Sequence, residues 1–126
     1  MYRQVYLKHG KEESLLRFHP WIFSGAIHHI DHGINEGDVV RVVTVSGEFI
    51  AVGHYQGGSI AVRVLTFRDV AIDGPFWQSR LSSALQMRIA IGLARASSCS
   101  TSQEPLTTNA YRLVHGEGDH LPGLII

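Results

Sequence analysis

The stretch GDVVRVVTVSGEFIAVGHYQ, residues 37–56, contains two apolar runs separated by a short polar segment. In the first run Val40, Val42 and Thr44 alternate with Val39, Arg41 and Val43, as expected for one strand of a hairpin. The segment SGE has residues typical of a tight turn, and FIAVGHY has the composition of a returning strand. These residues predict a β-hairpin.

Further short strands are predicted on both sides of this hairpin. QVYLKHG at 4–10 and WIFSGAIHHI at 21–30 are rich in β-forming residues, and IAVRVLTF at 60–67 follows a GGS turn. Between the first two, KEESLLRFHP at 11–20 predicts a short helix with acidic residues near its start. Five or six short strands with close turns favour a small barrel or sandwich.

The apolar strand that follows Pro20 is expected to enter the core. Pro20 disfavours the helical conformation for the residue before it and is expected to end the short helix. The helix has an apolar side, and alternate residues of the strand after it share one face. Leu15, Leu16 and Phe18 form the apolar side of the helix, and Trp21 and Phe23 are expected to belong to the core.

The composition changes after about residue 72. A helix is predicted over 74–95, with Asp73 or Gly74 as its N-cap and Pro75 in its first turn. The following SSCSTSQEPLTTN is polar and predicts a linker. AYRLVHGEGDHLPGLII at 110–126 predicts strand, glycine-rich turn and strand, a hairpin that would begin a second, truncated domain.

Composition bounds the function only loosely. The formal net charge is zero, so a nucleic-acid partner has to be argued from local groups. The single cysteine, Cys99, excludes an intramolecular disulfide framework and fits a reducing compartment. No signal segment opens the chain and no apolar run has membrane-spanning length, so a cytoplasmic location without a membrane partner is expected.

Two motifs could suggest a metal or phosphate site, and neither predicts one. His28 and His32 in IHHIDH would lie about 13 Å apart on a strand, too far to bind one metal ion. The segment GEGDHLPG at 116–123 lacks the Lys-Ser/Thr of a phosphate-binding loop. Its carboxylates, Glu117 and Asp119, would repel phosphate, so a hairpin turn is the better interpretation.

Basic residues gather at the first turn and the short helix. Lys8, Lys11 and Arg17 flank this region, with His19 just after it. On charge alone, an ordinary solvated helix explains them. Trp21 would become a platform for nucleic-acid bases if it were exposed instead of buried.

Four segments resemble a bacterial enzyme family. LKHGKEESLLRFHPWIFSGAI, GDVVRVVTVSGEFIAVGHYQ, IAVRVLTF and YRLVHGEGDHLPGLII are similar, in this order, to the N-terminal half of class I S-adenosylmethionine-dependent methyltransferases. These enzymes form 5-methylcytosine in 23S ribosomal RNA. The most specific pieces are SLLRFHPWIFSGAI and RLVHGEGDHLPGL.

The resemblance implies a mainly β fold with α: a PUA-like small pseudo-barrel that binds RNA, one long helix, and the start of a central domain. The implied divisions are residues 1–72, 73–107 and 108–126. The cofactor S-adenosylmethionine and the catalytic residues would belong to a missing C-terminal part, so the fragment itself is expected to be inactive and to bind no cofactor.

The resemblance also implies roles for particular residues. Ribosomal RNA would be the partner, with phosphate contacts from the basic residues and hydrogen bonds from Ser14 and His19. Glu117 and Asp119 would lie near the substrate in the full enzyme, so Asp119→Asn is expected to leave the stability of the fragment nearly unchanged. The implied RNA-binding residues are Lys8, Lys11, Ser14, Arg17, His19 and Trp21.

Two other functions stay open. The barrel could be a protein-interaction or packing module without RNA binding, which an apolar exposed face with scattered charge would favour. A histidine-dependent metalloenzyme is a weaker alternative. A homodimer through the exposed strand edges of residues 108–126 is also compatible with the sequence.

Overall fold

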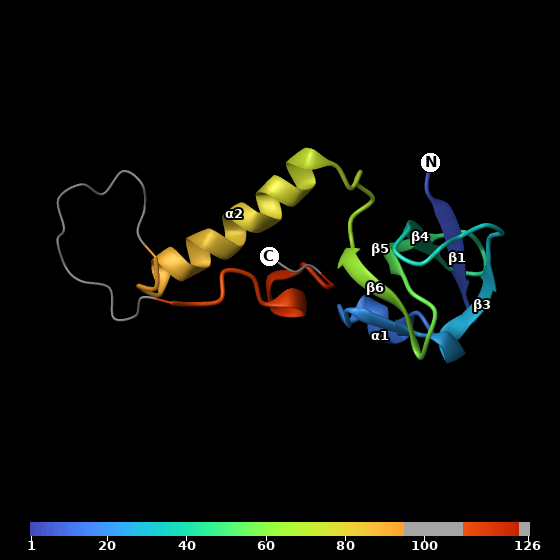
Figure 1. Ribbon diagram of the computed structural model, residues 1–126. Coiled ribbons are helices and arrows are strands. Elements are labelled where there is room, and N and C mark those ends of the chain that lie inside the picture. The colour runs from blue at the N-terminus through green and yellow to red at the C-terminus, as the bar shows by residue number, and fades with distance from the viewer. Residues whose placement is uncertain (95–109, 124–126) are drawn as a thin grey trace. The chain divides into compact units, whose positions relative to one another are not determined.

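The computed structural model of this 126-residue chain describes residues 1–94 and 110–123. The chain divides into two compact units, Met1–Ile72 and Asp73–Ile126. The first unit contains a curled six-stranded sheet, and the second contains one long helix, α2 (Figure 1). This architecture confirms the expected mainly β fold with α.

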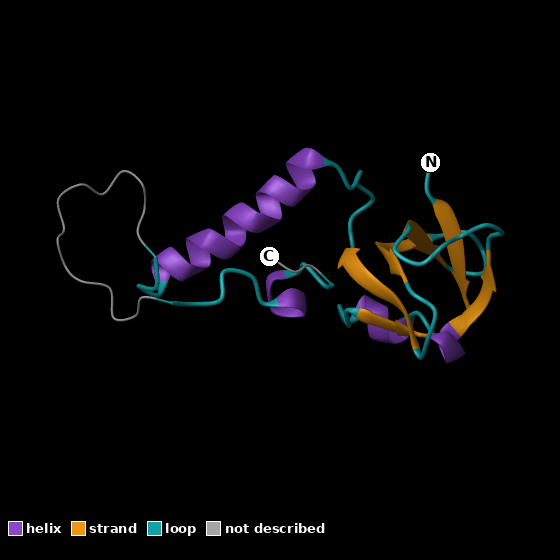
Figure 2. Ribbon diagram, viewed as in Figure 1, coloured by secondary structure: helices purple, strands orange, loops and turns teal. Residues whose placement is uncertain are grey.

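Six short strands form the sheet of the first unit, in the order β2-β6-β5-β4-β1-β3. All neighbouring strands are antiparallel except β1 and β4, which are parallel. Figure 2 shows these strands curling around one another. Their bounds are β1 Arg3–Leu7, β2 Trp21–Phe23, β3 Ile27–Ile30, β4 Val39–Val43, β5 Phe49–Tyr55 and β6 Ile60–Thr66.

The hairpin predicted from residues 37–56 is confirmed as β4 and β5. Val40 lies opposite Gly53, and Val42 lies opposite Ala51, in an antiparallel register. All four residues are buried, so this face of the hairpin belongs to the core. Gly53 has no room for a side chain, because a Cβ atom there would collide with the carbonyl of Arg63 on β6.

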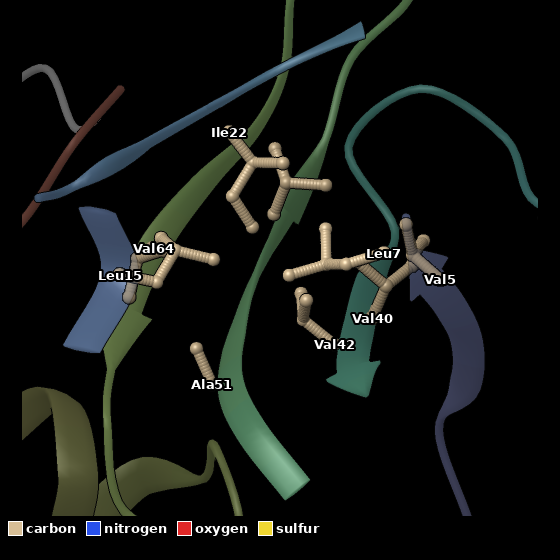
Figure 3. Packing of buried hydrophobic residues seen from close by; sticks show 9 residues of the cluster. Val5, Leu7, Leu15, Ile22, Val40, Val42, Ala51 and Val64 are labelled. Carbon is tan, nitrogen blue, oxygen red and sulfur yellow. The ribbon is translucent and has the colours of Figure 1, made fainter. Parts of the chain in front are cut away.

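Short aliphatic side chains fill the interior of the curled sheet (Figure 3). Leu15 points from the short helix α1, Glu13–Leu16, toward Val64 of β6. Ile22 is 2% exposed and points into the same core from β2. The buried cluster consists of Val5, Leu7, Leu15, Ile22, Val40, Val42, Ala51, Val62 and Val64.

The apolar side of the short helix and the strand after Pro20 are buried only in part, and the expectation that Trp21 and Phe23 both belong to the core is wrong for Phe23. Leu15 is buried, but Leu16 and Phe18 are 64% and 72% exposed. Because Ile22 occupies the inward position of β2, its neighbours Trp21 and Phe23 face outward. Trp21 is therefore partly buried, and Phe23 is exposed.

Helix α1 ends before Pro20, by a mechanism that does not involve proline. The N–H of His19 donates to the carbonyl of Ser14 at 3.1 Å, and the N–H of Phe18 donates to that of Leu15 at 2.9 Å. Phe18 adopts a left-handed φ of 62°. These bonds form a Schellman motif, which closes the helix at Arg17.

Helix α2 spans Gly74–Ala90 and is shorter than predicted. Its start is as expected, because the Asp73 side chain accepts a hydrogen bond from the N–H of Phe76 at 3.0 Å and Pro75 lies in the first turn. It ends where Gly92 adopts a φ of 80°. No helix in the described part of the chain is long and apolar enough to cross a membrane.

The hairpin predicted over 110–126 is wrong for residues 110–123, which contain a 3₁₀ helix at Gly116–Asp119 and no strand. The N–H of Gly118 donates to the carbonyl of His115 at 2.8 Å, and the Asp119 side chain accepts from the N–H of His115. These local bonds compact the segment and occupy groups that a strand would turn to a partner. Residues 124–126 and the predicted linker at 97–109 lie outside the described residues.

Candidate nucleic-acid interface

Lys8 and Lys11 are held at the two ends of one tight turn. The N–H of Lys11 donates to the carbonyl of Lys8 at 3.0 Å, and Gly10 inside the turn has a φ of 78°. The N–H of Lys8 donates to the carbonyl of Ala26 at 2.8 Å, which fastens the turn to the residue just before β3. Both lysine side chains belong to exposed residues, so their charges can reach a phosphate in solvent.

Arg17 lies after the last turn of α1 and is not an isolated cation. Its Nη2 atom is 2.7 Å from Oε1 of Glu13, and the two side chains are 77% and 71% exposed. Such an exposed pair contributes little to stability, so Arg17 can leave Glu13 and bind a phosphate instead. Ser14 is also exposed, and its carbonyl already accepts from two backbone N–H groups.

His19, Trp21 and Phe23 form a row of rings along β2, which we call the β2 aromatic row. The His19 ring lies 6.2 Å from the Trp21 ring and 6.3 Å from the Phe23 ring, centroid to centroid. The N–H of Trp21 lies 3.2 Å from Nδ1 of His19, which orients the imidazole against the strand. Sequence reasoning placed His19 and Trp21 in the candidate interface but assigned Phe23 to the core.

Arg63 extends this outward face onto the neighbouring strand. It lies directly opposite Trp21 in the antiparallel register of β2 and β6. On its other side it lies opposite His54 of β5, and its Nη1 atom hydrogen-bonds to Oε1 of Gln56. Sequence reasoning missed Arg63, although a single arginine within the apolar run IAVRVLTF was the available signal.

Asp119 lies in a different setting from the one expected. Its carboxylate accepts from Arg88 at 2.6 Å and 2.9 Å, and the two side chains are 4% and 8% exposed. The hydrogen bonds from Arg88 hold the pKa of the Asp119 carboxyl below its usual range, although burial opposes part of this effect. The same contact raises the pKa of Arg88. Asp119 is therefore a structural ion-pair partner. Its substitution should lower stability, whereas the sequence alone led us to expect that Asp119→Asn would leave stability nearly unchanged.

Glu117 is partly buried in the same 3₁₀ helix, and its role near a substrate stays a prediction.

Arg88 also donates through Nε to the carbonyl of Arg112 at 3.0 Å. Sequence reasoning did not single out Arg88, because a lone arginine on a helix usually faces solvent.

No group of three potential metal ligands is present within residues 1–94 and 110–123. His28 and His29 are exposed on β3, as expected for solvated histidines. The His29 and His32 rings contact each other edge to face with centroids 6.4 Å apart. Asp31 is engaged elsewhere, because its side chain accepts from the N–H of Gln4 at 2.8 Å.

Comparison with known proteins places this fold. The family model described as a PUA-like domain matches residues 5–67, half of the chain. The chain belongs to the PUA-like domain family. The matched residues begin in β1 and end just after β6, so the family corresponds to the curled sheet and its short helix α1.

Sequence relatives extend over the whole chain. The chain is 36% identical over 128 aligned residues to ribosomal RNA large subunit methyltransferase I of Klebsiella pneumoniae, covering 100% of this chain and 29% of the relative. It is 39% identical to the protein of the same name from Aeromonas hydrophila, covering 100% and 30%. The chain thus spans less than a third of the length of these curated relatives.

A solved structure shares the fold. A Streptococcus mutans protein described as a SAM-dependent methyltransferase superimposes with a TM-score of 0.70, covering 95% of this chain and 28% of that one. The two sequences are 14% identical, so this likeness bears on the fold alone.

Proposed function

We propose that this chain is the RNA-binding N-terminal region of an S-adenosylmethionine-dependent ribosomal RNA methyltransferase. The observation that carries the proposal is the similarity to large-subunit rRNA methyltransferases along the entire chain, at 36–39% identity, together with the PUA-like domain. The proposed substrate is a cytosine of 23S ribosomal RNA, methylated at C5 in the cytoplasm. The remainder of the longer protein would bind S-adenosylmethionine and perform the chemistry.

In this proposal the chain contributes affinity and orientation instead of catalysis. Lys8 and Lys11 present two exposed cations at the ends of one hydrogen-bonded turn, and Arg17 adds a third when it leaves Glu13. Cations held by a rigid turn can bind phosphates with little loss of backbone entropy. Because the whole chain is neutral, attraction to RNA has to come from such a local group.

The alternative is a packing or protein-interaction module. The exposed apolar side chains of Leu16, Phe18 and Phe23 favour it, because large exposed apolar groups often mark contacts. Self-association through residues 108–126 is a separate prediction, and the strand edges expected to mediate it are not seen in residues 110–123.

Salt dependence separates phosphate binding from the alternative. We would measure binding of a labelled large-subunit rRNA hairpin by fluorescence anisotropy at several salt concentrations. Two neutralised phosphates contribute roughly 1.5 to the slope of log affinity against log salt, so Lys8→Ala/Lys11→Ala should flatten the slope by about that amount.

The matched control is Arg3→Ala/Arg68→Ala, which removes two exposed cations elsewhere in the same unit. It should change the slope less. Equal slopes for the two double variants would place the RNA surface away from the turn, and no binding by the wild-type chain would overturn the proposed function for this region.

A further inference from the structure

The β2 aromatic row, His19, Trp21 and Phe23, has an organisation that phosphate binding does not require. Phe23 is 50% exposed, His19 is exposed and Trp21 is partly buried. The centroid of the His19 ring lies within 6.3 Å of those of both other rings, so the imidazole links Trp21 and Phe23.

The backbone keeps this surface rigid. Ile22 lies between Trp21 and Phe23 and points into the core, where it is 2% exposed (Figure 3). The strand is paired with β6 through Trp21 opposite Arg63 and Ile22 opposite Val62. Burial of Ile22 thus fixes the outward direction of both neighbouring rings. Trp21 and Phe23 are therefore held by a paired strand, whose register with β6 shifts between Ile22 and Phe23, and His19 lies just before this strand.

Positive charge lies directly beside the row. Arg63 is the cross-strand neighbour of Trp21, a position at which side chains are about 5 Å apart at Cβ. Its guanidinium is oriented by the hydrogen bond to Gln56. Aromatic faces next to an arginine match a nucleic-acid strand, because the rings stack on bases while the cation attracts the backbone.

We propose that the β2 aromatic row is a stacking platform for unpaired RNA bases, with Phe23 and Trp21 contacting base faces and Arg63 an adjacent phosphate. This inference rests on the proposed function and specifies it, because the RNA bound here would be single-stranded or splayed. Base faces inside an A-form duplex are covered by neighbouring base pairs and cannot reach the rings. Specific RNA recognition commonly uses such unstacked bases.

The test compares an unpaired oligoribonucleotide with an RNA duplex of the same length, using the whole chain. Trp21 and Trp77 are the two tryptophans, so Trp77→Phe leaves Trp21 as the only indole reporter. In this background the unpaired RNA should quench and shift the Trp21 fluorescence, whereas the duplex should do so much less.

Phe23→Leu removes the aromatic face but keeps an apolar side chain at an exposed position, so the barrel should stay folded. It should weaken binding of the unpaired oligonucleotide by about tenfold, the loss typical of one stacked base, with an unchanged salt slope. Phe18→Leu is the matched control, because Phe18 is also an exposed phenylalanine but contacts Phe67 instead of the row. It should bind like the wild type.

Failure of this inference can be told apart from failure of the proposed function. If the wild-type chain binds RNA but Phe23→Leu binds equally well, or if Trp21 responds equally to duplex, the stacking platform is wrong and RNA binding stands. If neither RNA form binds, both proposals are wrong. Concentration-dependent dimerisation that Phe23→Leu abolishes would assign the row to contacts between copies and overturn the platform.

Discussion

Phe18 is one of two non-glycine residues with a positive φ in the described part of the chain, together with His120. Glycine usually occupies the left-handed position that ends a Schellman motif, yet here a bulky aromatic has a φ of 62°. The ring contacts Phe67 edge to face, with centroids 5.2 Å apart, and Phe67 packs against the core. Aromatic contact therefore offsets backbone strain at this position.

We expect glycine and alanine at position 18 to differ in their effect on the stability of the fold. Both lose the ring contact, but only Phe18→Gly relieves the left-handed strain, so it should be more stable than Phe18→Ala by about 1 kcal/mol. Urea unfolding at equilibrium would measure the difference. Phe23 provides a control, because its φ of −77° suits any residue. There the glycine variant should be the less stable one, and the same order at both positions would contradict the strain argument.

The residues around Pro20 show where sequence reasoning succeeds and fails. A strand after Pro20 was predictable from its composition, but Trp21-Ile22-Phe23 is apolar at every position and carries no alternation. Size favoured burial of the aromatics. In the structure Ile22 is the buried residue instead. Because side chains alternate along a strand, a shift of one residue in which position faces inward turns the neighbouring side chains to the other face.

At the scale of elements, α2 and the 3₁₀ helix Gly116–Asp119 are connected by a buried ion pair. Arg88 reaches Asp119 with two hydrogen bonds and the Arg112 carbonyl with a third. Asp119 also accepts from the N–H of His115. This network fixes residues 112–119 against the helix, in one body of the second unit.

Removal of the Asp119 charge should destabilise this unit because Arg88 would remain buried without its anion. We expect Asp119→Asn to lower the unfolding midpoint clearly, whereas Glu13→Gln, which breaks an exposed pair, should cost less than about 0.5 kcal/mol. Because folding lowers the pKa of Asp119, its contribution is present above its unfolded value of about 3.8 and is lost as the pH falls further.

Thermal unfolding followed by circular dichroism at pH 7 and pH 3 would check this expectation. The deficit of Asp119→Asn relative to the wild type should be large at pH 7 and should shrink at pH 3. Equal effects of the two substitutions at pH 7 would mean that the ion pair contributes no more than a surface contact.

Elements with strong local signals were predictable, and elements fixed by distant partners were not. The hairpin β4–β5 has a turn between two β-rich runs, and α2 begins with Asp73 and Pro75, so both follow from nearby residues. The 110–123 segment depends on Arg88, which is 31 positions away from Asp119 in the sequence. The local pattern YRLV looks like a strand, but within residues 110–123 tertiary contacts decide otherwise.

At the scale of the whole molecule, the first unit has what an independent domain needs. Its nine-residue buried cluster lies entirely within residues 5–64, and the family match covers 5–67. The N–H of Ile72 donates to the Tyr2 hydroxyl at 2.8 Å, which fastens the end of this unit to its beginning. A boundary directly after this bond leaves the barrel intact.

We therefore expect a fragment of residues 1–73 to fold alone. We also expect its folding stability to depend on pH through a residue within the fragment. Burial lowers the pKa of His54 on β5 below its usual value of 6.5, with partial opposition from a hydrogen bond at the Gly37 backbone. The unfolded chain then binds more protons than the folded one below about pH 6.5. Stability should be full above this pH and should fall as the pH drops toward the folded pKa.

Urea unfolding of the fragment at pH 7.5 and pH 5.5 would measure this change, with His54→Gln and the exposed His28→Gln as the two variants. The midpoint should fall at the lower pH in the wild type and in His28→Gln, and it should fall less in His54→Gln. An unfolded fragment would show that the first unit needs residues beyond 73. A folded fragment whose pH dependence is the same in both variants would show that burial of the His54 imidazole does not link protonation to folding.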